Sequence, residues 1–152
     1  MKTLPQEFII LEIIPNHSDS TKGFLVQVQA LMIKEKQIVK RLDLRVREDL
    51  IDNPDLLRMI SYDKELFKYV EKEDLMKEFL SFIGDKPLLI IDNQYTLDYL
   101  KDIKNLQESI FPYLELEMSN DVFNELINKY QLEPSNHLVD LLYEALIFAN
   151  NK

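Results

Sequence analysis

The first third of the chain has the hydrophobic pattern of β-strands. Residues 8–14, Phe-Ile-Ile-Leu-Glu-Ile-Ile, are apolar at every position except Glu12, and Pro15 with the polar residues after it ends the run. A continuous apolar run of this length predicts a strand that is buried on both faces in the middle of a sheet. A carboxylate in such a strand is costly unless it lies at the strand end or is bound. Glu12 is therefore the first indication of a site.

Two further segments, residues 24–34 and 37–47, alternate between apolar and polar positions. In the first of them Gln27 and Gln29 fall on the polar face, which predicts a strand covered on one face only. The polar pair Glu35-Lys36 between the segments predicts a tight hairpin connection. Together with residues 8–14, the two segments predict a three-stranded antiparallel meander.

Helical spacing of apolar residues is typical of the rest of the chain. Asn53-Pro54-Asp55 predicts a helix start, and residues 72–83 have helical spacing up to Gly84, a residue type common just past a helix end. Residues 87–92 form a second apolar run, which predicts a buried parallel strand. The remaining predicted elements are a short helix or turn at 62–70, helices at 95–103, 121–130 and 137–149, and a last strand at 113–116. This order predicts one α/β domain, residues 1–152, with a mixed sheet flanked by helices.

The composition narrows the class of protein. With 152 residues, 46% of them hydrophobic and 30% charged, the chain is expected to form one globular domain with a substantial core. The sequence has no cysteine and no apolar run of membrane-spanning length, so we expect a cytoplasmic protein that does not enter a membrane. The net charge of −9 argues against binding of nucleic acid by bulk electrostatics. The only two glycines, Gly23 and Gly84, exclude Gly-rich phosphate loops.

The sequence also carries a family resemblance, which begins in the first strand. Residues 8–14, 82–85, 89–100 and 123–141 together resemble the DEDD 3′–5′ exonucleases, in particular the subfamily of the proofreading epsilon subunit of bacterial DNA polymerase III. The family has Asp-x-Glu at the end of its first strand, and here Glu12 and Ile14 stand at those positions. The resemblance covers roughly residues 8–150. It implies an RNase H-like fold with a five-stranded mixed sheet, in which the three N-terminal strands are antiparallel.

The other catalytic positions of the family fall in the second half of the chain. In residues 89–100 the position of the family's catalytic Asp is occupied by Thr96. In residues 135–141 the last acid is kept as Asp140, but Ser135 replaces the histidine that serves as general base in the family, and His137 stands where the family has Ala. The resemblance therefore implies a degenerate set of active-site residues.

The chemistry of the family requires the residues that are missing here. Hydrolysis of a phosphodiester needs two divalent metal ions about 3.5–4 Å apart, held mainly by carboxylates, and a base that activates water. Thr96 and Ile14 cannot supply a charge, and Ser135 does not titrate near neutral pH. We therefore expect a catalytically inactive exonuclease-like domain without a cofactor, which acts by binding a protein partner or a nucleic acid.

Two other functions are compatible with the same residues. The first is an active metal-dependent 3′–5′ exonuclease that uses Mg²⁺ or Mn²⁺ held by Glu12, Asp140 and Asp92 in an altered geometry. The second is a self-associating structural module, which would form a homo-oligomer. Glu12 and Asp140 are the candidate metal ligands in the first case. In the others they are remnants, solvated or bonded to backbone donors.

A basic cluster stands out against the acidic background. It consists of Lys34, Lys36, Lys40, Arg41, Arg45 and Arg47. As a binding feature it would be a docking strip for nucleic acid or an acidic partner. Alternatively, it is the polar face and tip of the hairpin, where edge lysines prevent the addition of a further strand.

Overall fold

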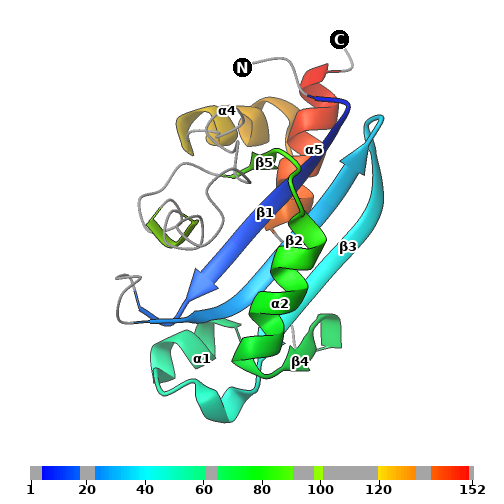
Figure 1. The fold of residues 1–152 in the computed structure, drawn as a ribbon. Coiled ribbons are helices and arrows are strands. Elements are labelled where there is room, and N and C mark those ends of the chain that lie inside the picture. Colours follow the sequence, from blue (N-terminus) through cyan, green and yellow to red (C-terminus); the bar gives the residue numbers. More distant parts are fainter. Residues whose placement is uncertain are drawn as a thin grey trace.

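A five-stranded mixed sheet forms the centre of the protein (Figure 1). The structure is a computed structural model that describes residues 5–17, 23–60, 65–90, 98–100, 120–132 and 138–150. The strands lie in the order β4-β3-β2-β1-β5. Strands β1, β2 and β3 form an antiparallel meander, whereas β5 is parallel to β1 and β4 is parallel to β3. Their bounds are Glu7–Pro15 for β1, Leu25–Lys34 for β2, Gln37–Val46 for β3, Lys68–Val70 for β4 and Leu88–Leu89 for β5.

Helices cover both faces of this sheet. The 3-10 helix η1 (Glu48–Leu50) and helices α1 (Pro54–Ile60) and α2 (Lys72–Ile83) follow the meander, and α4 (Asn120–Tyr130) and α5 (Leu138–Asn150) end the chain. In Figure 1, α2 lies in front of the sheet, and α5 passes behind β1 and β2. Within the described residues, no helix has both the length and the apolar character needed to cross a membrane.

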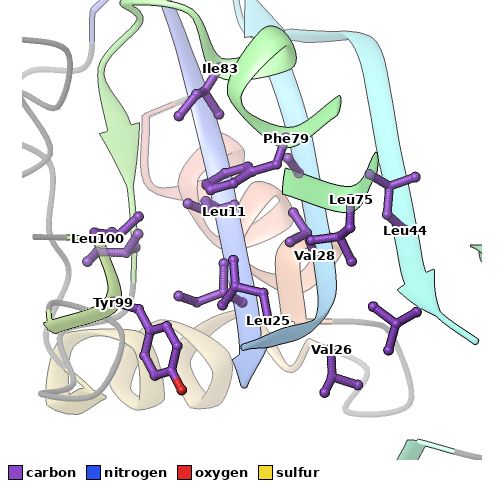
Figure 2. Packing of buried hydrophobic residues seen from close by; sticks show 14 of the residues in the cluster. Leu11, Leu25, Val26, Val28, Leu44, Leu75, Phe79, Ile83, Tyr99 and Leu100 are labelled. Carbon is purple, nitrogen blue, oxygen red and sulfur yellow. The ribbon is translucent and has the colours of Figure 1, made fainter. Parts of the chain in front are cut away.

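Each face of the sheet has its own core. On one face, Leu75, Phe79 and Ile83 of α2 pack against Leu11 of β1 and the inward residues of β2 and β3, as Figure 2 shows. On the other face, residues of α4 and α5 pack against Phe8 and Ile10 of β1 and their neighbours in β2. Because β1 lies inside the sheet, between β2 and β5, and contributes alternate residues to the two cores, its sequence is nearly continuously apolar. The prediction that it is buried on both faces was therefore right, but the middle strand of the sheet is β2.

Most of the predicted elements agree with the structure. Helix α2 has the predicted bounds, and Gly84 after it has φ +52°. Asn53 accepts hydrogen bonds from the backbone N–H groups of Asp55 and Leu56 (N···Oδ1 3.1 and 3.3 Å), which caps α1 as its sequence predicts. The connection Glu35-Lys36 is a two-residue turn with both φ angles positive, and Tyr143 of α5 donates a hydrogen bond to the Lys36 carbonyl (2.9 Å).

Two predictions about the strands were wrong, and a third lies outside the described residues. The fourth strand in the sequence is Lys68–Val70, at the end of a segment interpreted as a short helix or turn. The predicted strand at 113–116 lies outside the described residues, as does most of the predicted helix at 95–103. The prediction that β2 is covered on one face was wrong, because Gln27 and Gln29 are 5% and 1% exposed. The side chains of Gln27 and Gln29 lie on the face of the sheet that α5 covers, and the neighbouring strands β1 and β3 flank them.

Candidate functional site

Glu12 lies on β1, toward the end of the strand that points away from the α4–α5 core. It follows Ile10 on the same face of β1, and the register of the sheet places it opposite Gln29 of β2. The side chain is half-buried. Burial raises the pKa of the Glu12 carboxyl from 4.5 to about 7, because desolvation disfavours the ionised form. The carboxyl group is therefore partly protonated at neutral pH.

A chain of polar contacts begins at Gln29, the residue opposite Glu12, and extends across the sheet to α5. Gln29 donates a hydrogen bond to Asp43 of β3 (Nε2···Oδ1 3.0 Å), and Asp43 in turn binds Arg41 (Nε···Oδ2 2.7 Å). The two terminal nitrogens of Arg41 donate to the two carboxylate oxygens of Asp140 in α5, at 2.9 and 3.0 Å. This bidentate geometry is the strong form of an arginine–carboxylate contact. The hydrogen bonds to Asp140, followed by the one to Asp43, raise the pKa of Arg41, which stays charged.

A second polar contact lies one residue pair further along the same face. Arg45 of β3 is 1% exposed, and its Nε and one terminal nitrogen both donate to Oε1 of Gln27, at 2.9 and 2.6 Å. Its guanidinium lies 3.9 Å from the centroid of the Phe67 ring. The remaining terminal nitrogen, Nη1, is buried and has no hydrogen-bond partner among the described residues. Gln27 thus supplies the hydrogen-bond acceptor for two nitrogens of this buried cation.

The structure places the predicted site residues in different surroundings. Ile14 is half-buried on β1, opposite Gln27. Asp140 is bound by Arg41. Through Arg41 and Asp43 it is connected to Gln29, the residue opposite Glu12. The other predicted positions, Thr96, Ser135, Asp92 and His137, lie outside the described residues. The assignment of Glu12 and Asp140 as metal ligands stays a prediction.

The basic cluster of the hairpin divides into two groups. Arg41 and Arg45 lie on the α5 face of the sheet and bind side chains of the protein. Arg45 is buried, so the prediction that it belongs to a docking strip or to the polar face of the hairpin was wrong. Arg47 pairs with Glu71 at 3.0 Å. Lys34, Lys36 and Lys40 are exposed. Only the lysines of this cluster are therefore available as a docking surface.

Sequence reasoning missed the roles of Gln27, Gln29 and Asp43. The two glutamines alternate with apolar residues, and this pattern is the same for a solvated face and for a buried polar row. A distinguishing signal is present in β3, where Arg41, Asp43 and Arg45 have the same spacing of two and can pair with the glutamines across the strands. Complementary polar residues on two adjacent strands favour a buried row.

The raised pKa of Glu12 predicts a specific dependence of stability on pH. Because the folded protein binds the Glu12 proton more tightly than the unfolded chain, the contribution of this group to stability is fully present below about pH 4.5 and is lost as the pH rises through about 7. Denaturant unfolding of the wild type and of Glu12→Gln should therefore give a difference in unfolding free energy that falls over this range, by on the order of 3 kcal/mol. Glu7→Gln, on the same strand, is the matched control. A difference that is constant or rises with pH would contradict the assignment.

Comparison of the chain with known proteins adds no family to these observations. No family model matches it, and no curated protein matches it. The described residues establish an α/β fold with an open five-stranded mixed sheet between helices.

Proposed function

We propose that this protein is a catalytically inactive relative of the DEDD exonucleases, with an RNase H-like fold, and that it acts by binding a protein partner. The strand arrangement supports the fold part of the proposal. A meander of three antiparallel strands is extended at one edge by β4, parallel to β3, and at the other edge by β5, parallel to β1. The first strand lies inside the sheet and carries Glu12 toward the face covered by α5, the helix that contains Asp140.

The bidentate contact between Arg41 and Asp140 is the observation that carries the proposal. Both oxygens of the Asp140 carboxylate accept hydrogen bonds from one guanidinium. A metal ion at this carboxylate would have to displace Arg41 or lie close to its positive charge, and either is costly. Together with Ile14, Thr96 and Ser135 at the other catalytic positions of the family, this contact leaves Glu12 as the one acid of the family's set that could still act.

A protein partner is favoured over a nucleic acid by charge. The net charge of −9 repels a phosphate backbone, whose binding requires several lysine or arginine contacts. The three arginines of the basic cluster, Arg41, Arg45 and Arg47, are all bound to side chains within the protein.

One observation favours an active exonuclease as the second candidate. The Glu12 carboxyl, with a pKa raised to about 7 by burial, has the proton affinity that suits a general acid or base near neutral pH. In this case Glu12 would contribute proton transfer, and metal ligands would have to come from other residues.

An exonuclease assay separates the two candidates. Single-stranded DNA and RNA oligonucleotides labelled at the 5′ end are incubated with the protein and Mg²⁺ or Mn²⁺, and the products are sized on a gel. We expect no shortening by the wild type, so that wild type, Glu12→Gln and Asp140→Asn give the same result. Shortening that requires the metal and disappears in Glu12→Gln, a variant nearly identical in shape, would overturn the proposal and exclude a contaminating nuclease as its source.

A further inference from the structure

A groove lies on the opposite face of the sheet from the polar row, between α2 and the first half of β3. It has a volume of about 560 Å³. Met32 of β2, Leu42 of β3 and Phe82 of α2 form its apolar part. Met32 is buried, whereas Leu42 and Phe82 are partly exposed to the groove. A space of this size and lining can hold one or two apolar side chains of a ligand.

The rim of the groove is positively charged. Lys40, Lys77 and Lys86 line it together with one acid, Glu78. The Glu78 carboxylate is already bound by Lys68, at 2.9 Å. Lys86 lies 3.7 Å from Glu7, and within the described part of the chain no ion pair is formed by Lys40 or Lys77. Because Glu78 is bound by Lys68 and Lys86 lies near Glu7, Lys40 and Lys77 make most of the local positive field at the groove, on a protein whose net charge is −9.

We propose that this groove binds an extended acidic segment of a protein partner, with an apolar side chain of that segment seated on Phe82 and Leu42. The inference rests on the proposed function, since it names the surface and the chemistry of the partner that a non-catalytic domain would use. Carboxylates of the segment lie between Lys40 on one wall and Lys77 on the other. Charge steers the encounter and selects the partner, and the apolar contact adds affinity.

The surroundings of the groove favour a short acidic segment over a nucleic acid. Lys77 and Glu78 also line the adjacent hollow toward β4, whose other charged residues are Arg47, Lys68, Glu71 and Asp74. Arg47 pairs with Glu71 and Lys68 pairs with Glu78. A polyanion that continued past Lys77 would therefore meet cations that are already paired and the carboxylate of Asp74. The apolar part of the groove fits a hydrophobic side chain, which a sugar-phosphate backbone does not have.

The edge of the sheet leaves the groove open to an extended segment. Strand β4 pairs with β3 only from Leu44 to Val46, and residues 37–41 of β3 are exposed. Figure 1 shows this first half of β3 at the outer side of the sheet. A second copy of the chain is disfavoured as the occupant of this edge, because antiparallel self-pairing of β3 around Lys40 would place lysine opposite lysine.

Selection from a phage-displayed library of random peptides tests the inference, because the enriched sequences show which peptide chemistry the protein binds. The wild-type protein is the bait, and binding of the enriched peptides is measured by fluorescence anisotropy. We expect peptides that are rich in Asp and Glu and contain at least one large apolar residue. Their affinity for Lys40→Glu/Lys77→Glu should be weaker by about tenfold to a hundredfold. Both lysines are exposed, so this variant is expected to fold, which a thermal melt verifies.

The control is Arg58→Glu/Lys129→Glu, which makes the same change in net charge at exposed residues of α1 and α4. It should bind the peptides as the wild type does. The inference is overturned by the absence of enriched peptides, by peptides without acids, or by equal weakening in both variants. It is also overturned by an oligonucleotide that competes for the two lysines more tightly than the peptides. None of these outcomes bears on exonuclease activity, which the oligonucleotide assay decides separately.

Discussion

Replacement of Gln27 by leucine is expected to lower the free energy of unfolding by roughly 3–5 kcal/mol, although the two side chains are similar in size. Oε1 of Gln27 is the acceptor for both bound nitrogens of Arg45. Without it, a guanidinium that is 1% exposed keeps its charge and loses the hydrogen bonds that compensate its burial. Urea denaturation of the two proteins, followed by circular dichroism, measures the difference.

The double variant Gln27→Leu/Arg45→Met makes this prediction sharper. It removes the cation together with its acceptor, so it should recover most of the stability that Gln27→Leu loses. Gln29→Leu, on the same strand, is the matched control. It should cost less, roughly 1–3 kcal/mol, because Asp43 keeps its contact with Arg41. Additive losses in the double variant would show that Arg45 is stabilised by something other than Gln27.

Replacement of Phe79 by alanine is expected to have an effect of similar size, roughly 3–5 kcal/mol. Phe79 is fully buried in the second half of α2, and Figure 2 shows its ring next to Leu11 of β1. Its removal leaves a cavity between the helix and the sheet, which the surrounding strands cannot close without breaking their register. Thermal or denaturant unfolding measures the loss.

Phe82→Ala, on the same helix, is the control for the Phe79 substitution. Phe82 is only half-buried, so part of its surface is already in contact with water, and its removal should cost clearly less. An equal or greater loss in Phe82→Ala would mean that α2 is fixed to the sheet mainly by its C-terminal end.

The elements with a strong local signal could be predicted from the sequence. Helix α2 has apolar residues at helical spacing, an acidic first turn and a glycine directly after its last residue, so both ends are determined locally. The burial of β1 on both faces could be predicted from its continuous apolar run, but its place beside the middle strand β2 could not. In these cases the pattern of apolar residues within the element is enough to predict which side chains are buried.

The features that could not be predicted depend on a neighbouring element. Strand β4 has only three residues, and it is a strand because β3 offers its backbone at that place. The burial of Gln27 depends on Arg45, which lies 18 residues further along the chain, and on the ring of Phe67. The capture of Asp140 by Arg41 joins residues 99 positions apart, and no local pattern announces it.

The contact between Arg41 and Asp140 also bears on how reversible the loss of catalysis would be in evolution. On the proposed ancestry, the acids missing at positions 14 and 96 could each return by mutation, but neither change would release the carboxylate that remains. A protein that regained carboxylates at both positions would also gain the repulsion between them, with no metal ion to offset it. Arg41 would have to change as well, and its loss alone would leave Asp43 and Asp140 without their shared cation. On this ancestry each single step back would be unfavourable, and the contact of Arg41 with Asp140 would make the proposed loss of catalysis hard to reverse.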